Sequence, residues 1–236
     1  QAYELEPRPE FLEAAKATLG FTQSHMVEET DAEHGEMALY RFNNNQKLGT
    51  VVINILGIVD LARASGSKEY DPLLRKLGNF TKFMAEDNGR FLGYHVPKGH
   101  KYHGKTNDIV PGEAALALIY LAEYFDDDTW IEDLGNYWAY YMPLFRERAA
   151  KKHESAPWPY YSYDNEMRLA LVQMGPWTVM AANAYHARTG NEEVAKFGLE
   201  VARWMIDTYQ WRPGRTPWPD YTGGYYKMPE ELPAMQ

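Results

Sequence analysis

The residues best suited to chemistry gather just before an apolar run that begins at Val110. They are three histidines, an asparagine and an aspartate: His95, His100, His103, Asn107 and Asp108. Glu113 follows five residues after Asp108, inside a predicted helix. Because a helix N-terminus stabilises negative charge, the simplest interpretation is that Asp108 caps this helix and Glu113 occupies its first turn. The functional alternative is a general acid or base whose pKa is tuned by burial.

The three histidines also raise the question of a metal site. Histidine is a common metal ligand, and Asp108 could complete a set. The histidines are spaced by five and three residues, which matches no strong zinc signature such as His-Glu-x-x-His. We therefore predict neither a metal nor another cofactor. His95 and His103 are instead expected to act as acids, bases or hydrogen-bonding residues beside a ligand.

A second polar group lies in the connecting segment 151–173. Asp164, Glu166 and Arg168 occupy alternate positions there, and alternate residues of an extended segment point to the same side. An arginine beside carboxylates can bind the carboxylate of a substrate, such as a uronic acid, through two hydrogen bonds. A solvated surface ion pair is the plainer interpretation of the same residues.

Cleavage of a glycosidic bond requires two carboxyl groups that lie ~5 to 9.5 Å apart. One acts as the acid, and the other acts as the base or nucleophile. Asp108 or Glu113, paired with Glu166 or Asp220, would supply these residue types. We therefore take Asp108, Glu113 and Glu166 as the candidate catalytic residues. If the chemistry resembled that of an epimerase or a lyase, a tyrosine or histidine would carry the proton instead.

Aromatic residues are abundant in the connecting segments, and the chain has seven Trp and 18 Tyr. Flat rings with a polar edge suit sugar faces and also protein interfaces. Packing of loops against helix ends explains any single ring, but a dozen on one predicted face favour a binding role. The candidate ligand-binding residues are His95, His103, Asn107, Tyr161, Asp164, Arg168, Trp177, Trp218 and Asp220.

Composition excludes several classes of function. The 236 residues carry a net charge of −9 and no basic run, so neither nucleic acid nor an anionic membrane surface is an expected partner. Without cysteine there is no disulfide, cysteine-bound zinc or thiol nucleophile. The apolar run from Val110 is shorter than the ~20 residues of a membrane span, so we expect no membrane insertion. Gln1 at the start fits signal-peptide cleavage and an extracellular or periplasmic location, while a trimmed chain and a cytoplasmic location stay open.

The run from Val110 to Phe125 organises the chain, because it is apolar nearly all round and therefore predicts a buried helix. Similar runs begin near Leu48 and Met174. Their leading glycines stand at positions 49, 112 and 175, two equal steps of 63 residues. A fixed period of this kind indicates a repeat architecture.

Each repeat comprises a buried helix, a short turn, an amphipathic helix and a long connection. The predicted helices are 9–26, 48–64, 69–86, 112–125, 129–149, 175–188 and 192–211, with short strands at 36–42 and 90–96 and an acidic linker at 28–33. Short turns at one end and long connections at the other are typical of helical hairpins with one elaborated face. We expect one domain over residues 1–236.

The helix start Pro111–Leu116 and the segments Gly89–Tyr94 and Gly223–Tyr226 resemble the (α/α) six-hairpin toroid superfamily. That group includes six-hairpin glycosidases such as unsaturated glucuronyl hydrolases, sugar and uronyl epimerases, some polysaccharide lyases and the lanthionine cyclases. The resemblance covers residues 35–236 and implies an all-α toroid with short β-strands in its long connections. Lanthionine cyclases need a cysteine-bearing zinc site, which this chain lacks.

The resemblance also indicates how many hairpins a complete toroid would contain. A toroid of this type has about six hairpins, whereas this chain supplies about three and a half. We therefore expect an arc that is incomplete at its C-terminus or is closed by a second chain or a second copy.

The leading functional hypothesis is a carbohydrate-active enzyme, a glycoside hydrolase or a related epimerase or lyase, that acts on an oligo- or polysaccharide. The substrate would include uronate if Arg168 binds a carboxylate. The alternative is a non-catalytic helical-repeat scaffold that binds a protein or glycan and completes its toroid with another chain, because an open arc exposes apolar helix edges. Fold alone cannot choose between them.

Overall fold

The structure, a computed structural model, describes residues 7–42, 45–96, 100–101, 110–150, 163–210 and 222–223. Within these ranges the chain is mostly helical, with seven α-helices and one small sheet. The predicted predominance of helix is confirmed. Contacts along the chain divide it into two compact units, residues 1–137 and 138–236, which are described separately. The single domain stays a prediction.

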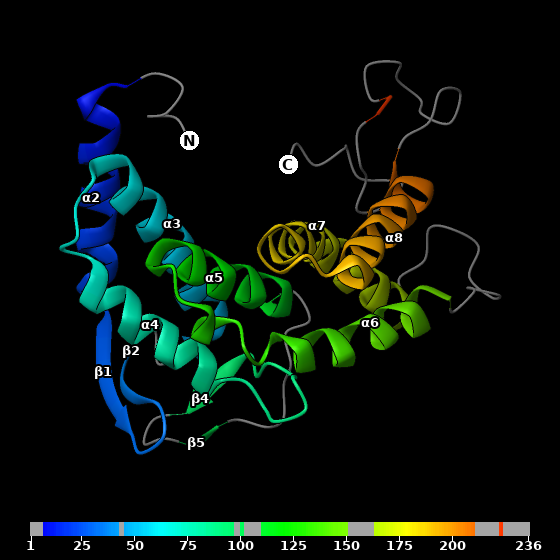
Figure 1. Cartoon of the computed structure of the whole chain (residues 1–236), viewed down its shortest axis with the longest axis horizontal. Helices are drawn as coiled ribbons and strands as arrows, with labels where there is room; N and C mark the ends of the chain where they lie inside the picture. The colour runs from blue at the N-terminus through cyan, green and yellow to red at the C-terminus, as the bar shows by residue number, and fades with distance from the viewer. Residues whose placement is uncertain are drawn as a thin grey trace. The chain divides into compact units, whose positions relative to one another are not determined.

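The first unit contains a five-stranded antiparallel sheet (Figure 1). In order across the sheet its strands are β1 (Met26–Asp31), β2 (Gly35–Phe42), β3 (Asn45–Lys47), β4 (Tyr94–Val96) and β5 (His100–Lys101). β1 takes the place of most of the predicted acidic linker, and its residues 26–31 pair with 35–40 of β2. The linker prediction was wrong because an edge strand can carry charged side chains, which obscures the alternating pattern.

The first unit also holds most of the helices that were expected from the sequence. They are α2 (Pro9–Gln23), α3 (Leu48–Ser65), α4 (Asp71–Phe83), α5 (Val110–Phe125) and the start of α6 (Leu134–Ala150). The helix predicted over 129–149 is divided, because a 3-10 turn, η1 (Asp128–Trp130), precedes α6. The two apolar helices, α3 and α5, run in the same direction. At one end a Cβ atom on Gly49 would lie 3.3 Å from Val110 Cγ2, and at the other end Arg63 Nη2 lies 3.3 Å from Glu123 Oε2.

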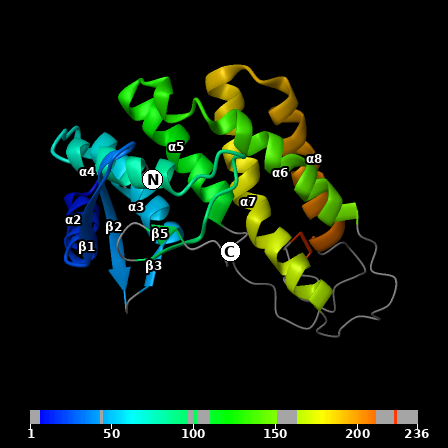
Figure 2. The ribbon, with the colours of Figure 1, turned by 90° about the horizontal axis from the view of Figure 1, so that it is seen from below.

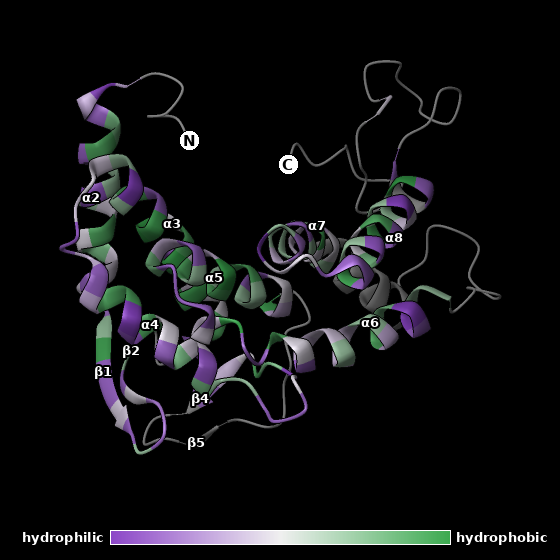
Figure 3. Ribbon diagram, viewed as in Figure 1, coloured by the Kyte–Doolittle hydropathy of each residue, from purple (hydrophilic) through white to green (hydrophobic). Residues whose placement is uncertain are grey.

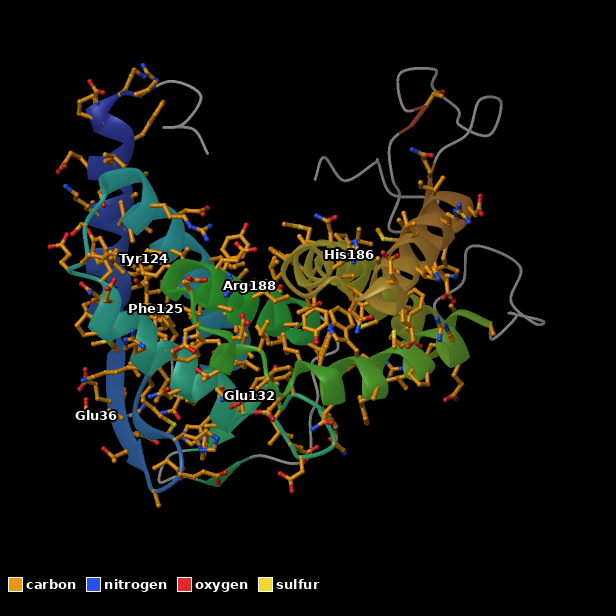
Figure 4. The ribbon with its side chains drawn as sticks, in the orientation of Figure 1. Glu36, Tyr124, Phe125, Glu132, His186 and Arg188 are labelled. Atoms are coloured by element: carbon orange, nitrogen blue, oxygen red, sulfur yellow. The ribbon has the colours of Figure 1, made fainter. Side chains whose placement is uncertain are left out.

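Helix α4 runs antiparallel to α5 and covers one side of it. Near the start of α4, Asp71 Oδ1 accepts a 2.7 Å hydrogen bond from Tyr124 Oη at the end of α5. Tyr124 is labelled in Figure 4. In the middle of α4, a Cβ atom on Gly78 would lie only 2.6 Å from Leu121 Cδ1 and 2.9 Å from Trp130 Cη2. The glycine therefore permits close packing of α4 on both α5 and η1.

Helix α5 is buried on nearly all sides, as its sequence predicts. Figure 3 shows it as predominantly apolar along its length. Twelve of its 16 residues are buried, and Glu113 is the one charged residue among those twelve. A buried carboxylate in an otherwise apolar helix needs a separate explanation, because an ionised carboxylate is costly to remove from water.

Helix α3 is the one helix among the described residues that is long and apolar enough to cross a membrane. The core helix of a soluble protein meets the same criterion, and eight residues of α3 are buried inside the first unit. Its length and composition are therefore weak grounds for a span. The absence of membrane insertion stays a prediction.

The second unit contains the rest of α6 and a hairpin of two helices, α7 (Tyr163–Thr189) and α8 (Glu192–Tyr209) (Figure 2). Close contacts show that α7 and α8 are antiparallel. A Cβ atom on Gly175 would lie 3.2 Å from Met205 Cγ, and one on Gly198 would lie 2.9 Å from Ala182 Cβ. Glycine at these two positions lets the helix backbones approach closely.

Helix α6 packs on α8 through aromatic rings and one ion pair. The ring of Phe145 lies edge-on to Phe197, with centroids 5.6 Å apart, and edge-on to Trp204 at 5.4 Å. Beside them, Arg146 Nη2 lies 2.9 Å from Glu200 Oε2. The three helices thus form a small bundle with its own aromatic core.

The start of α7 corrects one prediction from the sequence. An extended connection was expected as far as Gln173, but α7 begins at Tyr163. Three candidate residues lie in this helical stretch: Asp164, Glu166 and Arg168. Residues two positions apart lie on different sides of an α-helix, so the expected common face of all three is wrong. Good helix formers in residues 163–174 outweigh the Gly-Pro pair, and Pro176 lies inside the helix.

Of the three glycines spaced by 63 residues, only two lie at the start of a helix. Gly49 is the second residue of α3 and Gly112 the third of α5, whereas Gly175 is the thirteenth of α7. The glycine in α7 instead marks a close approach to α8.

Candidate functional site

The strongest candidate site surrounds Glu113, where the N-terminal ends of α3 and α5 meet. The residue is 8 % exposed. Its Oε2 atom lies 3.6 Å from the position that a Cβ atom on Gly49 would take, so the carboxylate faces the first turn of α3. Within the described part of the chain, this carboxylate makes neither a hydrogen bond nor an ion pair.

Burial raises the pKa of Glu113 from its ordinary 4.5 to about 7. A buried carboxyl group favours its neutral form, since the charged form loses its hydration. Near pH 7 such a group is present in both protonation states. It can therefore donate or accept a proton at neutral pH, which is the property of a general acid or base.

The same end of α3 is joined to the sheet. The Leu48 N–H donates a 3.1 Å hydrogen bond to the carbonyl oxygen of Gly93, which fixes the start of α3 beside β4. Lys47 lies directly before the helix, and its Nζ is 5.7 Å from the ring centroid of Tyr94. The side chain of Lys47, the N-cap residue, makes no capping hydrogen bond to α3. A lysine and a helix N-terminus both favour an anionic or strongly hydrogen-bonding ligand.

His95 is less accessible than the sequence interpretation assumed. Its side chain is 0 % exposed, and its ring meets Phe80 and Phe83 edge-on at 5.6 Å each. Nε2 lies 2.9 Å from Glu29 Oε2, while Nδ1 has no hydrogen-bond partner in the part of the chain that the structure describes. This environment holds β4 against β1 and α4 and offers no surface to a ligand, so we leave His95 out of the site.

Several other candidates fall outside the described residues. They are His103, Asn107, Asp108, Tyr161, Trp218 and Asp220. His100 lies in β5, but its side chain is not described. Among the side chains that are described, no group of three or more His, Asp or Glu residues could hold a metal ion.

The remaining candidates lie in the second unit. Asp164, Glu166 and Arg168 belong to the first two turns of α7, and their side chains are not described. Trp177 is half-buried in the same helix. Their roles in catalysis or ligand binding stay predictions.

Sequence reasoning missed two features of the site. Gly49 was noted only as a marker of the repeat, although a Cβ atom there would lie tightly, at 3.3 Å, against Val110 Cγ2 and in ordinary contact, at 3.6 Å, with Glu113 Oε2. Lys47 was not singled out at all. An uncapped helix start preceded by lysine is a signal in the sequence that could have drawn attention to it.

No model of a protein family matches the chain, and no curated protein is significantly similar to it.

Proposed function

We propose that the protein is a carbohydrate-active enzyme in which Glu113 acts as general acid or base. The observation that carries this proposal is the state of Glu113: buried, without a described partner, and with a pKa raised to about 7. Groups whose pKa is strongly shifted by burial are enriched at functional sites. A second carboxylate would come from Asp108, two residues before the start of α5, or from Glu166 or Asp220.

The arrangement of the first unit supports the architectural part of the proposal. Two apolar helices, α3 and α5, point the same way, and α4, which lies between them in the sequence, runs antiparallel to α5. Repetition of this unit would generate an arc of an (α/α) toroid whose inner helices all present their N-termini at one end. Long connections at that end would form the carbohydrate site, as the resemblance to six-hairpin glycosidases implies. A secreted or periplasmic enzyme would fit this substrate.

A screen of oligosaccharides tests the proposal, with hydrolysis, elimination and epimerisation each monitored on the full chain. Once a substrate is found, Glu113→Gln should lower kcat by about 10²- to 10⁴-fold, the usual contribution of a general acid or base. Glu69→Gln is the matched control, because Glu69 is exposed in the turn after α3, at the opposite end from Gly49. Activity of Glu113→Gln within twofold of the control would refute the role of Glu113.

One observation favours the alternative of a binding scaffold. Ile53 on α3 is 44 % exposed, next to the exposed Gly57 one turn further along. An apolar helix edge of this kind would be covered if a second copy or another chain continued the arc. Light scattering gives the native mass: a particle heavier than the 27.2 kDa chain would support this alternative, and a monomer would count against it.

A further inference from the structure

A second feature of the first unit is independent of Glu113. A cavity of about 220 Å³ lies between the β1–β2 turn, the end of α4 and the start of α6. Leu118 is its one lining residue from α5, and no residue of α3 reaches it. Its volume is below the ~300–1,000 Å³ of sites for drug-sized ligands, so only a small molecule would fit.

The rim of this cavity is acidic. Four carboxylates line it: Glu33, Glu86, Asp87 and Asp133. The lining lysine, Lys82, is already engaged, because its Nζ donates 3.0 Å hydrogen bonds to the Thr129 carbonyl oxygen and to Glu132 Oε1. Among the described residues, the carboxylates of Glu33 and Asp87 have no hydrogen-bond or ion-pair partner.

The floor of the cavity is aromatic. Phe91, Trp130 and Tyr137 all line it and are all buried, with the rings of Phe91 and Tyr137 5.9 Å apart. Trp130 is 7 % exposed, and its indole N–H has no acceptor among the described residues. The opposite edge of that indole packs against Gly78 of α4. Aromatic faces beside carboxylates attract organic cations through the ring quadrupole.

The walls are held in place by the backbone, so the cavity is formed before any ligand arrives. Gly89 has a φ of 87°, and its backbone packs directly on that of Asn136 in α6. The Glu86 N–H donates a 2.8 Å hydrogen bond to the Arg90 carbonyl oxygen, which closes the loop after α4. A preformed site loses less conformational entropy on binding.

We propose that this cavity binds a small organic cation of the aliphatic diamine class. One ammonium group pairs with Glu33 on the β1–β2 turn and the other with Asp87 on the loop after α4. The methylene groups between them lie over the aromatic floor. An anionic or neutral ligand of the same size would leave the unpaired carboxylates uncompensated.

Isothermal titration calorimetry on the full chain tests this proposal, with 1,4-diaminobutane as the probe and 1,4-butanediol as its uncharged counterpart. The diamine should bind and the diol should not. The double variant Glu33→Gln/Asp87→Asn should weaken diamine binding at least about fivefold, which corresponds to ~1 kcal/mol for exposed charge pairs. Both substitutions preserve side-chain shape at sites near the surface, so folding should be retained.

The matched control is Glu10→Gln/Glu192→Gln, which removes the same charge from exposed residues that do not line the cavity. It should bind the diamine as the unmodified chain does. Equal weakening in the two double variants would show that only net charge matters and would overturn the proposal. Binding of the diol as tightly as the diamine, or no binding of the diamine at millimolar concentration, would overturn it too.

Discussion

Replacing Glu113 by Gln should change how the stability of the protein depends on pH. The pKa of Glu113 is about 7 in the folded protein and ordinarily 4.5, so between these values the folded state holds more protons than the unfolded chain. The contribution of Glu113 to the free energy of unfolding must then fall as pH rises through this range. At ~1.4 kcal/mol per pH unit, the loss amounts to roughly 3 kcal/mol by about pH 8.

Glutamine has the shape of the neutral carboxyl group but cannot ionise. At about pH 4 the variant and the unmodified protein should therefore be similarly stable, while at about pH 8 the variant should be more stable by up to roughly 3 kcal/mol. Urea denaturation followed by circular dichroism over this pH range measures the difference. Taking the difference between the two proteins cancels the titration of all other groups.

Glu69→Gln serves again as control, since loss of an exposed carboxylate should leave the pH dependence nearly unchanged. A difference between Glu113→Gln and the unmodified protein that stays constant from about pH 5 to pH 8 would refute the reasoning, because it would mean that Glu113 titrates alike in both states. If Glu113→Gln is more stable but less active, it shows the trade-off expected when a catalytic carboxylate is buried away from water.

Two further predictions concern packing in the first unit. Gly78→Ala should destabilise the protein by about 1–3 kcal/mol, because the added methyl group would overlap the ring of Trp130. Gly57→Ala should stabilise the protein by up to about 1 kcal/mol, because no atom lies within 4 Å of the position that the added methyl group would take. Thermal unfolding of both variants checks the opposite signs, and a stable Gly78→Ala would contradict the close contact. His95→Ala should cost roughly 3 kcal/mol through loss of a buried ring and of the partner of Glu29, as measured by urea denaturation. Loss of ligand affinity at unchanged stability would instead favour a binding role for His95.

The buried helices could be predicted because the apolar pattern that marks them lies within each helix's own sequence. The run from Val110 to Phe125 has no polar face, and only a core position satisfies such a helix. The short link before α8 was equally visible, because Gly190, with a φ of 71°, ends α7. In both places a few neighbouring residues determine the outcome.

The errors arose where distant partners decide the structure. β1 forms because β2 pairs with it, and its own charges conceal the strand. The burial of His95 was equally hidden, because Glu29, 66 residues away, and two phenylalanines of α4 enclose it; its role beside a ligand stays a prediction. Glu113 could be named from the sequence as an acid at a helix start, but its raised pKa depends on how closely α3 approaches at Gly49.

The connections of the first unit differ greatly in length, and this has a consequence for how the protein could diversify. Five residues, 66–70, join α3 to α4, whereas 26 residues, 84–109, join α4 to α5. The long connection enters α5 three residues before Glu113. Insertions, deletions and substitutions after Val96 could therefore alter what reaches the carboxylate while the packing of α3, α4 and α5 is left unchanged. In directed evolution of a new specificity, residues 97–109 are the ones to randomise first, while the sequences of α3, α4 and α5 are kept constant.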